Sequence, residues 1–114
     1  MRKMVDTGDL VVLRTEQPPG LTVRGDLEPR HVRQFSEALR ATATEQDGDV
    51  YLDCGGLQVI SLEGLRAVVD AALALAQGDR TLIVHSLSPY FHRIFRLAQW
   101  DDTPGLVFDG PPEA

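Results

Sequence analysis

The sequence predicts an α/β fold, with a mixed sheet of about four to five strands packed with helices. The sheet is expected to begin with an N-terminal hairpin and to continue with parallel strands. Three points predict this. Strand-like apolar runs alternate with helical stripes, and such alternation of strands and helices implies right-handed crossovers, which is the second point. The length is a third, because 114 residues form one domain, residues 1–114, with one sizeable core.

The first half of the chain is expected to form a hairpin and a helix. Residues 10–13 and 21–23 are strand-like runs, and Pro18-Pro19-Gly20 between them suits a chain reversal. Pro29 suits the first turn of a helix, and an apolar stripe then continues until the polar residues 45–48. The first helix is therefore predicted over residues 29–44.

A strand, a loop and a helix start are predicted in the centre of the chain. Residues 50–52 are apolar with β-branched and aromatic character, and Asp53-Cys54-Gly55-Gly56 is expected to end that strand in a loop. From Leu62 to Ala76 apolar residues recur at three- and four-residue steps, which is typical of one helix face. Ser61 is then the natural N-cap of this helix.

The last third is predicted to add a strand, a helix and a short edge strand. Residues 81–84 are apolar enough for a parallel central strand buried on both faces. Ser88 caps and Pro89 starts a third helix. Residues 106–108 suit a short edge strand, and residues 110–114 suggest an irregular tail.

The composition limits the classes of partner and the cellular compartment that we expect for this protein. The net charge of -6 and the pI near 4.9 oppose attraction to nucleic acid or anionic lipid, because the general field repels phosphate. The chain has neither a run of about 18 apolar residues, as a transmembrane helix needs, nor a signal-peptide core. We therefore expect a cytoplasmic protein without membrane insertion.

The sequence contains little that indicates a metal site, a cofactor site or a catalytic site. Cys54 is the only cysteine, and His31, His85 and His92 show no ligand-like pairing. The surroundings of Ser61 lack the first glycine of a nucleophile elbow, and Gly55-Gly56 is too short for a phosphate loop. We expect no metal, no cofactor and no enzymatic activity.

The segment 49–65 resembles the STAS domain of bacterial anti-sigma factor antagonists. Tyr51-Leu52-Asp53 corresponds to the family's strand and closing aspartate, Val59-Ile60 to its hydrophobic pair, and Gly64-Leu65 to the residues that open the helix. The resemblance covers roughly residues 10–108. It implies a fold with these strands and helices, and a role in transcription regulation through protein–protein interaction.

Three positions depart from the family pattern. Ser61 stands at the second aspartate, Leu62 at the first serine and Glu63 at the phosphorylatable serine. The resemblance thus makes Glu63 the equivalent of the phosphoacceptor, with a fixed charge that cannot accept phosphate. A carboxylate in a first helical turn is favoured by the helix dipole whatever the function, so both interpretations of Glu63 remain open. Ser61 could be a displaced phosphoacceptor, but the cap is the favoured interpretation.

Two neighbouring residues also carry alternatives. Asp53, at the carboxyl end of a predicted central strand, could be functional or could only end the strand and bind loop amides. Cys54 could be a reactive thiol, but a small buried filler is the favoured interpretation.

The resemblance implies a non-catalytic interaction module that regulates a cytoplasmic partner, such as a kinase-like anti-sigma factor. Its docking surface would be formed by Asp53, Ser61, Leu62, Glu63 and Gly64. The alternative is a small-ligand sensor or a cytoplasmic accessory module of a transport system. A pocket between Asp53 and Ser61 would favour the alternative, and a convex surface would favour docking.

Overall fold

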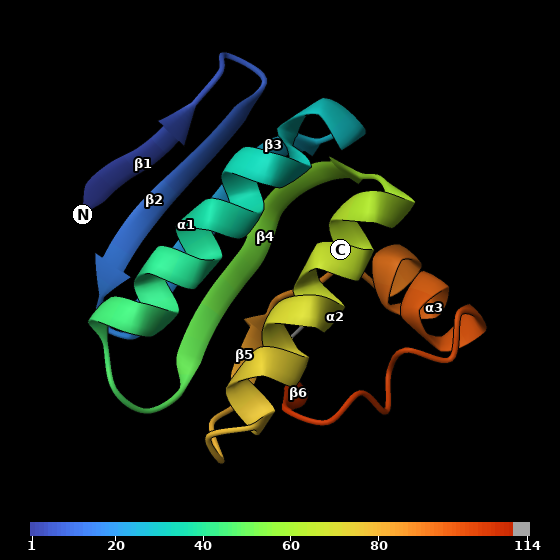
Figure 1. Ribbon diagram of the computed structural model, residues 1–114. Coiled ribbons are helices and arrows are strands. Elements are labelled where there is room, and N and C mark those ends of the chain that lie inside the picture. Colours follow the sequence, from blue (N-terminus) through green and yellow to red (C-terminus); the bar gives the residue numbers. More distant parts are fainter. Residues whose placement is uncertain (111–114) are drawn as a thin grey trace.

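The computed structural model describes residues 1–110, and of the tail expected at residues 110–114 all but Gly110 lies outside the described part of the chain. These residues form six strands, three α-helices and one short 3-10 turn (Figure 1). In chain order the elements are β1 (Arg2–Asp6), β2 (Leu10–Glu16), β3 (Pro19–Leu27), η1 (Pro29–His31), α1 (Val32–Glu45), β4 (Val50–Ile60), α2 (Leu62–Ala76), β5 (Leu82–His85), α3 (Pro89–Leu97) and β6 (Leu106–Asp109).

The six strands form one mixed sheet in the order β1-β2-β3-β4-β5-β6. The pairs β1–β2 and β2–β3 are antiparallel, and the pairs β3–β4, β4–β5 and β5–β6 are parallel. The predicted fold class and the N-terminal hairpin are therefore confirmed, with one strand more than expected. The extra strand is β1, whose polar and largely exposed sequence RKMVD gives no strand signal.

All three helices pack on one face of this sheet. Figure 1 shows α1 and α2 side by side over the strands, and Phe95 of α3 contacts Phe108 of β6 with ring centroids 5.3 Å apart. Strand residues that face the helices are buried, among them Leu52, Leu82 and Val84. The residues that alternate with them, such as Ile83, are only half-buried.

The prediction that residues 81–84 are buried on both faces is thus wrong. An apolar run in a parallel strand usually indicates two covered faces, but Ile83 is only half-buried between the buried residues Leu82 and Val84, and the helices of residues 1–110 lie on one side of the sheet (Figure 1). This sheet is a two-layer structure with one helical layer.

Strand β4 does not end at Asp53 but continues to Ile60, so the loop predicted from Asp53 is wrong. The two glycines belong to the strand, which stays paired with β3 through register shifts. A Cβ atom on Gly56 would lie 2.8 Å from Cγ of Arg24, so the absent side chain makes room for a neighbour on β3. Gly56 therefore allows close contact between β3 and β4, and it does not form a turn.

Candidate functional site

The end of β4 and the start of α2 are joined at Ser61. The Ser61 amide donates to the carbonyl of Leu27 at 2.8 Å, which continues the pairing of β4 with β3. Its Oγ accepts a hydrogen bond from the amide of Gly64 at 3.0 Å, and its backbone is extended with φ −76° and ψ 162°. Ser61 is therefore the N-cap of α2, as predicted, and its hydroxyl satisfies one free amide of the first turn.

Gly64 lets the first turn of α2 approach the sheet closely. A Cβ atom at this position would lie 3.0 Å from Cγ and Cδ2 of Leu27 and 3.1 Å from Cγ1 of Ile60. The next residue, Leu65, is 1% exposed in the core. Gly64 was predicted to lie in the docking surface, but it is buried and supports that surface from below.

The exposed side chains at this end of the molecule include two large apolar ones and one carboxylate. Leu62 is 58% exposed, Val59 on β4 is 45% exposed, and Glu63 is exposed beside Leu62. We call Val59, Leu62 and Glu63 the α2-start surface. A large apolar side chain on each side of a helix start, next to a fixed carboxylate, leaves apolar area in water that a partner protein could cover.

Val59 was not predicted as a site residue. The sequence predicted a loop there, whereas in the structure Val59 belongs to the continued strand β4 and its side chain is exposed three residues before Leu62. Residues 57–60 show no period-two alternation, because Gln58 and Val59 are both exposed, so no local pattern indicated the outward side chain of Val59.

Asp53 lies away from this surface. It precedes Ser61 by eight residues of strand, which is roughly 25 Å. Its side chain is on the face without helices, paired in register with Thr22 and His85, and its Oδ1 accepts from the amide of Gly55 at 2.9 Å. A hollow of about 370 Å³ there is lined by Asp53 and His85 but not by Ser61. The structure thus brings Ser61, Leu62, Glu63 and Gly64 together and leaves Asp53 out.

Cys54 is a buried core residue. It is 4% exposed, and burial, with a smaller contribution from the charge of Asp53, raises the pKa of its thiol to about 12. The thiol is therefore protonated and unreactive at neutral pH. The filler interpretation fits this environment, and the thiolate needed by a reactive cysteine does not.

Comparison with known families identifies the fold. The family described as "Mlab, STAS domain" matches residues 10–108. This chain belongs to the STAS family. The STAS match covers the sheet from β2 onward, both long helices and the whole α2-start surface. Comparison with curated proteins gives no match.

Two solved structures share the architecture of this STAS domain. An anti-sigma factor antagonist from Mycobacterium paratuberculosis is 16% identical, with a TM-score of 0.68 and 90% of each chain covered. A candidate anti-sigma factor antagonist from Thermotoga maritima is 11% identical, with a TM-score of 0.67, covering 86% of this chain and 84% of that one. At such identities the likeness establishes the fold. No helix among residues 1–110 is long and apolar enough to cross a membrane.

Proposed function

We propose that this STAS domain is a non-catalytic interaction module that docks through the α2-start surface onto a cytoplasmic regulatory protein of bacteria, such as a kinase-like anti-sigma factor. The observation that carries the proposal is the exposed pair Val59 and Leu62 beside Glu63. The Ser61 cap and the close contact of Gly64 position the first turn of α2 against the sheet beneath this surface. The likeness to antagonist structures supports the class of partner.

The proposal also concerns how phosphorylation of this segment affects docking. In this proposal Glu63 takes the place of the family's phosphoacceptor serine, and Leu62 has no hydroxyl that could replace it. Glutamate carries about one negative charge where phosphoserine carries about 1.5 to 2 with three acceptor oxygens, so it can imitate phosphate only in part. We propose that docking is set by this permanent charge and is not switched by phosphorylation of the loop.

The docking surface is tested by capture from the native cytoplasm, followed by titration of the purified partner. Leu62→Asp places a charge in the proposed contact and should weaken binding strongly. Leu97→Asp is the matched control, since Leu97 is 78% exposed on α3, on a different helix. Equal affinities of the two variants would place the interface elsewhere.

Glu63 is tested with the same partner. Glu63→Ser and Glu63→Lys should change the dissociation constant at least several-fold, while loss of the helix-dipole interaction costs about 1 kcal/mol of folding free energy or less. If wild type and both variants bind equally, Glu63 acts only at the helix start.

Phosphorylation is tested by incubating the domain with ATP and the partner kinase. The intact mass should remain unchanged. Stoichiometric phosphate on Ser61 would contradict the proposal and make Ser61 a relocated acceptor.

A further inference from the structure

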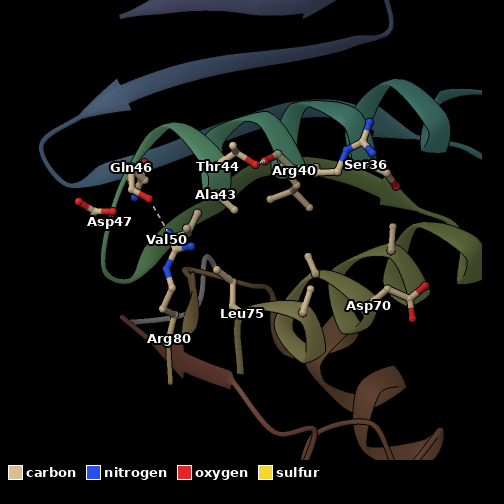
Figure 2. A pocket seen from close by; sticks show the side chains of 14 residues that line it. Ser36, Arg40, Ala43, Thr44, Gln46, Asp47, Val50, Asp70, Leu75 and Arg80 are labelled. Atoms are coloured by element: carbon tan, nitrogen blue, oxygen red, sulfur yellow. Dashed lines mark hydrogen bonds between the residues drawn. The ribbon is translucent and has the colours of Figure 1, made fainter. Parts of the chain in front are cut away.

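The helices α1 and α2 do not close against each other over β4. Between them lies a cleft of about 560 Å³, which Figure 2 shows with the side chains that line it. This volume is within the range of roughly 300 to 1,000 Å³ that small-molecule sites occupy. The cleft is separate from the α2-start surface, because none of Val59, Leu62 and Glu63 lines it.

The floor and walls of the cleft are apolar. Val50 of β4, Leu39 of α1 and Leu75 of α2 form its deepest, buried part. On α2 the residues turned toward α1 are Ala67, Ala71 and Ala74, which recur at three- and four-residue steps on one flank. Their methyl groups leave open the space that larger side chains would fill, so an apolar body of limited width fits between the helices.

The charges at the rim differ between the two ends. At one end Arg80 donates from Nε to the carbonyl of Gly48 at 2.8 Å and from Nη2 to the carbonyl of Gln46 at 2.7 Å, so it is committed to the backbone. Asp47 lies at this same end (Figure 2). Arg80 and Asp47 together leave little net charge there.

The other end carries an uncompensated cation. Arg40 is exposed, and its guanidinium makes no ion pair or hydrogen bond with any side chain or carbonyl of residues 1–110. Figure 2 shows it directed along the rim toward Ser36, one turn earlier on α1. Asp70, across the cleft, is bonded to Arg66 at 3.2 Å. A guanidinium with a neighbouring hydroxyl is a donor set for a carboxylate.

We propose that the α1–α2 cleft binds a small carboxylic acid with an apolar body, seated with its hydrocarbon part among the alanines and its carboxylate on Arg40. A single charge suits this rim, because one free guanidinium balances one carboxylate, while a dianionic phosphate would leave one charge unbalanced across the cleft from the carboxylate of Asp70. The inference does not depend on the docking proposal.

The test adds decanoate, as the probe, to the whole chain. Binding is monitored through the chemical shifts of the backbone amides in two-dimensional NMR spectra. Decanol and decylamine are matched probes with the same hydrocarbon chain and a neutral or cationic head. The amides of α1 and α2 that face the cleft should shift, decanoate should bind more tightly than decanol, and added salt should weaken decanoate alone. Decylamine should bind most weakly.

Arg40→Gln removes the charge and should weaken decanoate roughly three- to fivefold, the size expected of an exposed ion pair, without changing decanol. Arg33→Gln is its control, since Arg33 is on α1 with a side chain 90% exposed and does not line the cleft. Ala71→Leu should block all three probes, and Ala41→Leu, outside the cleft, should not.

Two results would overturn the proposal. If decanoate and decanol bound with equal affinity, and Arg40→Gln changed neither affinity, the cleft would not recognise a carboxylate. The probe would not bind in the cleft if the amides of the cleft did not shift. The same conclusion would follow if Ala71→Leu gave a folded spectrum and left the shifts unchanged. Arg40→Gln alters only an exposed position, so it remains informative if Ala71→Leu does not fold.

Discussion

Ser61 and Gly64 show how two small residues position a surface that they scarcely contribute to. The Ser61 hydroxyl holds the first turn of α2, and the missing side chain of Gly64 lets that turn rest on Leu27 and Ile60. Leu62 and Glu63 are thereby fixed in solvent next to Val59. A partner would meet side chains that start from a helix turn already held by a cap and by packing, which lowers the ordering cost of binding.

Replacement of Ser61 by alanine should lower the free energy of unfolding by about 0.5 to 2 kcal/mol, because one amide of α2 loses its acceptor. Denaturant unfolding measures this. Ser36→Ala in the middle of α1 is the control, since the Ser36 hydroxyl caps no helix. An unchanged midpoint together with lost partner binding would show that Ser61 acts at the surface instead.

The Cys54 thiol should be unreactive in the folded protein. Burial raises its pKa to about 12, so at pH 8 the thiolate fraction is very small and the sulfur is shielded from reagents. A thiol-specific chromogenic disulfide should react fully in concentrated denaturant and only slowly in native buffer. Rapid native labelling would contradict the burial of Cys54.

At the scale of elements, Glu45 ties the end of α1 to the N-terminal strands. Its Oε2 accepts from Nη1 of Arg14 on β2 at 2.6 Å and lies 3.4 Å from Nη2 of Arg2 on β1. The hydrogen bond from Arg14 is the largest cause that lowers the pKa of this carboxyl below its ordinary value of 4.5. The helix and the hairpin are thus coupled through one carboxylate.

The Glu45 contact predicts a pH dependence of stability. A carboxyl whose pKa is lowered by folding stabilises the folded state above its unfolded pKa, near 4.5, and this stabilisation is lost as the pH falls through the lower folded value. Glu45→Gln should therefore be less stable than wild type at pH 7, and the difference should shrink in acid. Glu37→Gln is the control, because the ion pair that Glu37 makes within residues 1–110 is with the exposed Arg33, at 3.7 Å. A difference independent of pH would rule out this account.

At the scale of the whole molecule, one sheet and one helical layer enclose one core. The buried residues of the strands, α1, α2 and α3 belong to a single hydrophobic cluster, and Trp100 packs against it after α3. The last strand β6 joins the same sheet beside β5. Nothing in this arrangement divides residues 1–110 into parts with separate cores.

We therefore predict that the chain unfolds as one unit. The fluorescence of Trp100, the single tryptophan, and far-ultraviolet circular dichroism should give coincident denaturant transitions. An earlier fluorescence transition would show that α3 and β6 unfold separately from the rest.

Local features of the sequence were sufficient for the elements whose determinants lie within a few residues. The Ser61 cap is decided by a serine and an amide three residues apart, and the α2 stripe by a period of 3.6 residues. The alternation of strands and helices likewise indicated a mixed sheet. These patterns were enough to predict the fold and the position of Leu62 and Glu63 at a helix start.

Only the tertiary structure decided which strands pair and which faces are covered. Tyr51 pairs with Gly20 and with Ile83, both about 30 residues away, and no local pattern encodes those partners. Such pairing extends β4 through its glycines, moves Asp53 away from Ser61 and turns Val59 outward. The one-sided helical layer leaves Ile83 half-exposed, and the alanine flank of α2 becomes a cleft only because α1 lies opposite it. The coverage of a sheet face and the pairing of strands depend on residues that are distant in sequence. Helix caps and hydrophobic periodicity depend on residues that are close in sequence.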